Sequence, residues 1–122
     1  MTSKVFVYGT LKQGNRVRGM HMFGNAEFVG NAETTHSNYH MYSLGAFPAV
    51  VLGGKSKISG EVFDVDSETM KYLDQIEGYP DFYTRDIVDT SLGKAWMYHI
   101  TDIENYNAKP LTPQGDTITW SR

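Results

Sequence analysis

The sequence predicts a single α+β domain over residues 1–122, in which one helix packs on a mixed or barrel-like sheet of about seven short strands. Two observations lead to this expectation. Short runs of β-branched and aromatic residues, separated by glycine and proline turns, recur along most of the chain and are typical of strands. One segment, residues 66–78, has apolar residues at helical spacing instead.

The first strand is expected at residues 5–8, where two valines and two aromatic residues precede Gly9. Residues 10–25 are rich in glycine and have few periodic apolar positions, so we expect a loop with one irregular helical turn. The next four strands are expected at residues 26–35, 39–44, 49–52 and 57–65.

The helix is expected to begin at Asp66 or Ser67, because either side chain can cap the first turn. Met70 and Leu73 form its apolar stripe. Gly78 is the expected left-handed residue at its end. The helix therefore directly follows the strand at residues 57–65.

Two further strands are expected after the helix, at residues 83–90 and 94–101, joined by a turn at Leu92 and Gly93. The remaining residues, 102–122, are polar and rich in turn-forming residues. Trp120 near the end belongs either to the core or to an interface.

Composition excludes several classes of function. The chain has no cysteine, which excludes disulfides, thiolate nucleophiles, iron–sulfur clusters and cysteine-based zinc sites. The net charge of -3 argues against general nucleic-acid binding. No apolar run approaches about 18 residues, and the start of the chain lacks the apolar stretch of a signal peptide. We therefore expect a cytoplasmic protein with neither a nucleic-acid nor a membrane partner.

Glu77 breaks a local rule of helix patterning. It lies four residues after Leu73 and seven after Met70, which places it on the apolar, inward face. A negative charge at the C-terminal end of a helix is disfavoured by about 0.3–1 kcal/mol. Burial and the helix dipole would both raise the pKa of Glu77, as suits a general base near neutral pH. Alternatively, the helix end frays and Glu77 points to water.

Two other features have both a functional and a structural interpretation. The turn at residues 8–11 follows a strand and a glycine, so its backbone N–H groups could bind a carboxylate or an oxyanion, or it is only a turn. Asp74 is either an acid/base partner of Glu77 or a hydrogen-bond acceptor for a nearby loop. Basic side chains at positions 12, 16 and 18 either attract an acidic ligand or are simply solvated.

A metal site is not expected. His36 and His40 have the spacing of two metal ligands on a helix, but the surrounding pattern is strand-like. Residues four apart on a strand are separated by about 13 Å. No third ligand is evident in the sequence, so the expected site contains neither a metal nor a cofactor.

Four blocks of the sequence, in order, resemble the gamma-glutamylcyclotransferase-like proteins, especially the gamma-glutamylamine cyclotransferase branch. The blocks are VFVYGTLK at residues 5–12, YSLGAFPAV at 42–50, GEVFDV at 60–65 and LDQIEGYP at 73–80. Together they extend over most of the chain. The resemblance implies a small mixed β-barrel of about six to seven strands with a flanking helix.

The resemblance also implies a reaction and a site. The reaction releases 5-oxoproline and a free amine or amino acid from a small gamma-glutamyl amide, without a cofactor. The implied catalytic residue is Glu77, and the implied substrate-binding residues are Tyr8, Gly9, Thr10, Leu11 and Tyr83. We expect a monomer or a weak homodimer.

The sequence departs from the family pattern at two places. An asparagine that often follows the loop glycine in close relatives has no clear register here, where residues 15–18 read NRVR. Phe63 stands where relatives often carry tyrosine. Both departures leave the substrate preference open. The alternative function is a binding or regulatory module with the same fold and pocket and little turnover.

Overall fold

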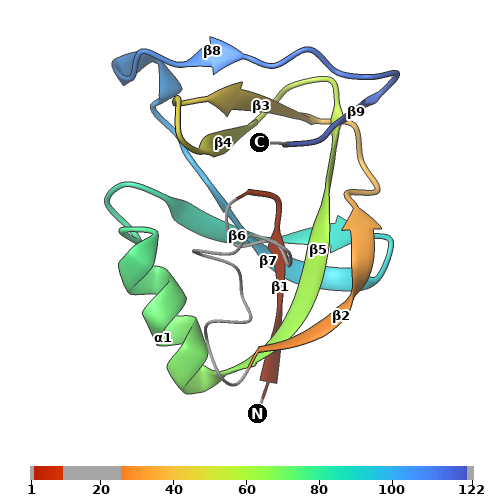
Figure 1. Ribbon diagram of the computed structural model, residues 1–122, viewed down its shortest axis with the longest axis vertical. Helices are drawn as coiled ribbons and strands as arrows, with labels where there is room; N and C mark the ends of the chain where they lie inside the picture. Colours follow the sequence, from red (N-terminus) through yellow and green to blue (C-terminus); the bar gives the residue numbers. More distant parts are fainter. Residues whose placement is uncertain (1, 10–25, 121–122) are drawn as a thin grey trace.

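The computed structural model describes residues 2–9 and 26–120, and it has one α-helix among short strands (Figure 1). The elements are β1 (Thr2–Val7), β2 (Ala26–Glu33), β3 (Tyr39–Ser43), β4 (Pro48–Leu52), β5 (Lys57–Asp66), α1 (Ser67–Ile76), β6 (Thr84–Thr90), β7 (Gly93–His99), the 3-10 turn η2 (Ile103–Asn105), β8 (Lys109–Pro110) and β9 (Thr117–Ile118). The predicted α+β class is therefore confirmed. The loop expected at residues 10–25 lies outside the described residues.

The larger sheet is mixed and has the strand order β2-β5-β1-β7-β6, with β9 added beside β5. The β1–β7 and β5–β9 pairs are parallel, and the other pairs are antiparallel. In the described part of the chain one bridge, between Thr34 and Thr90, connects the ends of the two outer strands. The sheet curls toward a barrel but is not a closed one.

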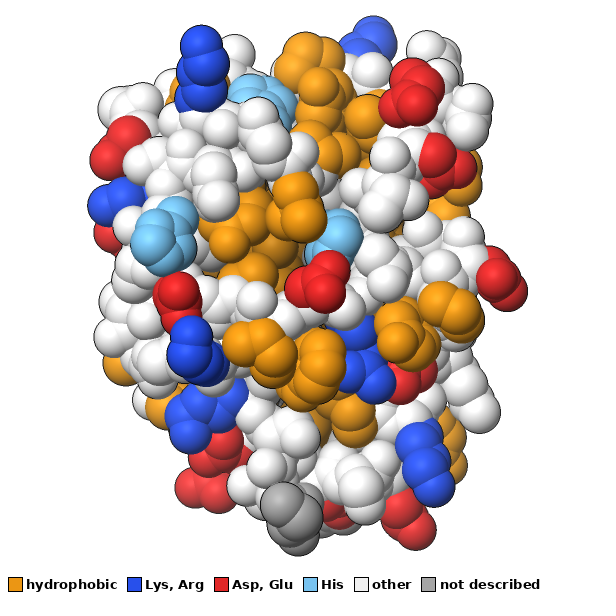
Figure 2. Space-filling view, turned by 180° about the vertical axis from the view of Figure 1, so that it is seen from behind, with side chains coloured by type: hydrophobic (Ala, Val, Ile, Leu, Met, Phe, Trp, Pro, Cys, Tyr) orange, Lys and Arg blue, Asp and Glu red, His pale blue; other side chains and the backbone are white. Residues whose placement is uncertain are grey.

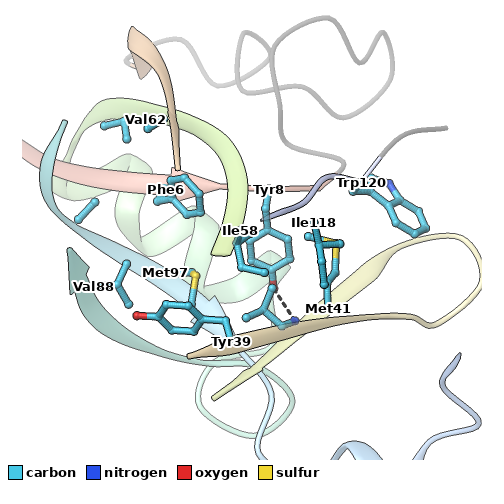
Figure 3. Close-up of a cluster of buried hydrophobic side chains, with 13 residues drawn as sticks. Phe6, Tyr8, Tyr39, Met41, Ile58, Val62, Val88, Met97, Ile118 and Trp120 are labelled. Carbon is cyan, nitrogen blue, oxygen red and sulfur yellow. Dashed lines mark hydrogen bonds between the residues drawn. The ribbon is translucent and has the colours of Figure 1, made fainter. Parts of the chain in front are cut away.

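A smaller sheet of β4, β3 and β8 lies at one end of the larger sheet (Figure 1). One hydrophobic cluster joins the two sheets, with Phe6 of β1, Met41 of β3, Val50 of β4 and Met97 of β7 all fully buried (Figure 3). Trp120 belongs to this cluster and is 8% exposed, so it is a core residue.

The second hydrophobic cluster lies between the larger sheet and α1. Leu73 of the helix is fully buried in it, together with Val5 of β1 and Val65 of β5. Asp66 is the cap of the helix, because its side chain accepts a 2.8 Å hydrogen bond from the Thr69 N–H. Strand β5 thus passes into α1 without a loop, which fixes the helix against the sheet.

Hydrophobic side chains also reach the surface. On the face seen in Figure 2 they are interspersed with charged and other polar side chains. None of the helices in the described part of the chain is long and apolar enough to cross a membrane.

Candidate active site

Helix α1 ends in a tight left-handed turn that begins at Glu77. Gly78 has a φ of 66°, and its N–H donates to the Gln75 carbonyl oxygen at 3.2 Å. The Tyr79 N–H donates to the Asp74 carbonyl oxygen at 2.9 Å. This pair of bonds is the Schellman arrangement of helix ends, in which glycine is favoured at the left-handed position. The helix end at Glu77 is therefore fixed by hydrogen bonds.

The chain after Gly78 returns toward Glu77 before it enters β6. The Phe82 N–H donates to the Gly78 carbonyl oxygen at 2.8 Å, and the Tyr83 N–H donates to the Glu77 carbonyl oxygen at 3.2 Å. The Phe82 and Tyr83 rings pack edge to face with centroids 4.8 Å apart. This closed loop brings Tyr83 beside the helix end.

The Glu77 side chain is partly buried, and burial raises its pKa to about 7. Among the described residues, its carboxylate has no hydrogen-bond or ion-pair partner. Burial also raises the pKa values of Tyr8, Tyr83 and Tyr98, and the nearby charge of Glu77 adds to each rise. The interpretation of Glu77 as an inward carboxylate is therefore favoured over that of a solvated one.

Three separate parts of the chain meet near Glu77. The Tyr83 Oη donates a 2.7 Å hydrogen bond to the carbonyl oxygen of Pro48, the first residue of β4. Gly9 follows β1 and lies so close to the Pro48 ring that a Cβ atom would come within 2.8 Å of the Pro48 Cγ. Only a glycine fits this approach without displacement.

Tyr8 precedes Gly9 and is held in place by its side chain. The residue is 6% exposed, and its ring lies in the core between the sheets (Figure 3). Its hydroxyl donates to the Tyr98 carbonyl oxygen at 2.8 Å and accepts from the Val50 N–H at 3.2 Å. These bonds hold the end of β1, from which Gly9 follows. Thr10 and Leu11, the other two residues of the predicted turn, lie outside the described residues.

Asp74 has a structural explanation that does not require acid/base chemistry. It accepts hydrogen bonds from Arg85 Nε at 2.8 Å, from Arg85 Nη2 at 3.2 Å and from the Tyr98 hydroxyl at 2.6 Å. Arg85 and Tyr98 were not predicted as site residues. No sequence pattern pairs them with Asp74, because they come from strands eleven and 24 residues further along the chain.

The described residues include no cluster of three or more histidine, aspartate or glutamate side chains that could hold a metal ion. His36 Nε2 lies 3.2 Å from the Asp89 carboxylate. The His40 ring instead packs edge to face against Tyr42, with centroids 5.3 Å apart. The two histidines therefore have different partners.

Fold and site together define a small α+β protein with one partly buried carboxylate at the end of its helix, near a glycine turn. Residues 5–122 match the family described as gamma-glutamyl cyclotransferase, AIG2-like, and the chain belongs to this family. A Vibrio cholerae protein that bears the family's name is 40% identical over 117 residues, which make up 95% of this chain and 96% of that protein.

A second relative and two solved structures are also similar to this chain. The gamma-glutamylcyclotransferase family protein YtfP of Escherichia coli K12 is 38% identical over 97 residues, 78% of this chain and 80% of its own. The solution structure of Escherichia coli YtfP has a TM-score of 0.66, with 88% of this chain and 90% of that chain covered, at 34% identity. The crystal structure of PH0828 from Pyrococcus horikoshii has a TM-score of 0.70 at 28% identity, with 89% and 85% covered.

Proposed function

We propose that this protein is a gamma-glutamyl cyclotransferase that converts a small gamma-glutamyl amide into 5-oxoproline and a free amine or amino acid. The main observation in support is the Glu77 carboxylate, which is partly buried and whose pKa is raised to about 7. A carboxylate with a pKa near the working pH serves both as a proton acceptor and, after protonation, as a proton donor.

In the proposed reaction the substrate supplies its own nucleophile. Glu77 takes a proton from the α-amino group of the glutamyl unit, and the amine nitrogen then attacks the δ-carbonyl carbon. A five-membered ring closes as the new C–N bond forms. The bond to the leaving amine breaks, and Glu77 returns the proton to the departing nitrogen. Substrate and products balance without water, an oxidant or a cofactor.

The developing oxyanion and the substrate carboxylate need hydrogen-bond donors. We assign this role to the backbone N–H groups of Gly9, Thr10 and Leu11, since preorganised N–H groups stabilise charge as it forms. Tyr83 bounds the site and holds it together through its bond to Pro48. Ring closure also requires a curled substrate, so fixed walls favour the reactive geometry.

The test is release of 5-oxoproline from gamma-glutamyl amino acids, gamma-glutamyl-ε-lysine and glutathione. Glu77→Gln should fold and release none, because the amide cannot accept the proton. Glu68→Gln is the matched control, since Glu68 is an exposed residue of the same helix and should leave turnover unchanged.

Two results would contradict the proposal. Full activity of Glu77→Gln would remove Glu77 as the base. A wild-type protein that binds these substrates but releases no 5-oxoproline would be a binding module.

A further inference from the structure

The guanidinium of Arg85 is held by a carboxylate at its edge and by two aromatic rings. Nε and Nη2 donate to the two Asp74 carboxylate oxygens at 2.8 and 3.2 Å. The Tyr79 ring lies on the guanidinium with its centroid 4.7 Å from Cζ, and the Trp96 ring lies 4.3 Å away. The side chains of Arg85 and Asp74 are only 17% and 22% exposed. Such a bidentate, stacked arrangement fixes the position of an arginine.

The partners of Arg85 lie on both sides of Glu77 in the chain. Asp74 is three residues before Glu77, in the last turn of α1, and Tyr79 is two residues after it. A backbone hydrogen bond of 2.9 Å also joins these two partners. A single guanidinium therefore connects the helix before Glu77 to the turn after it and packs both against Trp96 of β7.

We propose that Arg85 is the positioning residue of Glu77, because it holds Asp74 and Tyr79, which flank Glu77 in the chain, in one fixed arrangement. Arg85 itself does not touch the substrate in this proposal. The inference rests on the proposed function, since positioning matters only if Glu77 takes part in the reaction.

Burial is the physical cause that raises the pKa of Glu77. Arg85, Asp74 and Tyr79 together fix the helix end that carries Glu77, and so they help to maintain this burial. The titratable groups on packed elements that sense the charge of Glu77 are Tyr8, Tyr83 and Tyr98, and this charge raises the pKa of each.

The first experiment needs no turnover. The Glu77 carboxyl is titrated by NMR in the wild type, in Arg85→Met and in Lys94→Met, an exposed cation on β7 that serves as control. Loss of Arg85 loosens the helix end and lets water reach Glu77, so its titration midpoint should move down from about 7 toward 4.5. Lys94→Met should leave the midpoint in place. An Arg85→Met midpoint equal to that of the wild type would overturn the proposal.

The second experiment separates positioning from simple stability. Arg85→Lys keeps the positive charge but loses the bidentate hydrogen bonds to Asp74 and most of the stacking on the two aromatic rings. We expect kcat per folded molecule to fall by about 10- to 100-fold, with KM within about twofold of the wild type. An unchanged kcat would overturn the positioning role even if the variant melts at a lower temperature.

A double variant, Asp74→Leu with Arg85→Met, guards against a folding defect, since replacing both members of an ion pair by apolar residues often retains stability. The proposal expects this variant to be folded and still slow, and wild-type kcat would overturn it. Inactivity of the wild type on every substrate would instead reject the proposed function. The NMR titration, which needs no turnover, would then be the test of whether Arg85 positions Glu77.

Discussion

The Tyr83 hydroxyl donates a 2.7 Å hydrogen bond to the Pro48 carbonyl oxygen, and both residues are buried. This bond connects the loop that follows Glu77 to the first residue of β4. The other side of Pro48 is in close contact with Gly9. The Tyr83 hydroxyl therefore links the loop after Glu77 to the proline against which Gly9 packs.

Tyr83→Phe should destabilise the protein, because it removes the donor and leaves a buried carbonyl oxygen without this partner. We expect a loss of about 1–3 kcal/mol in the free energy of unfolding, measured in urea. Tyr72→Phe is the control, since Tyr72 is 60% exposed and should change stability by less than about 0.5 kcal/mol. Equal losses in the two variants would show that the hydrogen bond to Pro48 does not contribute to the free energy of unfolding.

Gly9→Ala should displace the Pro48 ring. The added Cβ would lie 2.8 Å from Pro48 Cγ and 2.9 Å from Cδ, and a proline ring cannot rotate away. We expect a loss of stability of about 1–3 kcal/mol and lower turnover. At Gly30 the nearest atom is the flexible tip of Leu92, at 3.0 Å, so Gly30→Ala should cost less. A Gly9→Ala protein with normal stability and activity would mean that this close approach is not required.

Gly78→Ala tests the turn after Glu77, and Gly115→Ala supplies a matched control. The two glycines have nearly the same φ, 66° and 65°. Each alanine should therefore cost about 1–2 kcal/mol for the left-handed backbone. At Gly78 the new Cβ also lies 3.1 Å from the Phe82 Cβ, whereas Gly115 has open space. The thermal midpoint should fall further for Gly78→Ala, and the reverse order would refute this account.

The raised pKa of Glu77 predicts that stability falls as pH rises. Between the ordinary value of 4.5 and about 7, the folded protein binds more protons at this residue than the unfolded chain does. The charged carboxylate is therefore disfavoured in the fold above pH 7, by about 3 kcal/mol.

Urea titrations from pH 5 to pH 9 measure this effect directly. Glu77→Gln should gain stability over the wild type progressively from pH 5 to pH 8, with no further gain above that. Glu68→Gln, on the exposed face of the helix, should differ from the wild type by the same amount at every pH. A Glu77→Gln difference that is flat over this range would show that the Glu77 pKa is not raised.

The helix and its end could be predicted from the sequence because their causes are local. Asp66 caps the first turn, and Gly78 supplies the left-handed turn that ends the helix. The same periodicity that identified Leu73 as a core residue placed Glu77 on the inward face. Near the helix, local spacing was therefore sufficient.

Other parts of the structure depend on contacts between distant segments. The two-residue strand β9 has no periodicity, and it exists because it pairs with Lys57 and Ile58 of β5. The bonds that join Arg85 and Tyr98 to Asp74 form only once β6 and β7 have paired and packed beside α1. Local sequence patterns do not indicate contacts between such distant segments, so the bonds of Asp74 with Arg85 and Tyr98 were not predicted.

Strand β1 lies in the middle of the larger sheet, and among the described strands one of its two edges is covered only by β7. Val5 pairs with Trp96 in the parallel β1–β7 contact, and the Tyr8 hydroxyl bonds to the Tyr98 carbonyl. Until β7 has emerged from the ribosome, the strand that becomes the middle of the sheet is an open edge. A nascent chain stalled before that point exposes an apolar strand to pairing with other chains. Pairing of β7 with β1 therefore both covers this edge and brings Tyr98 to its contact with Asp74.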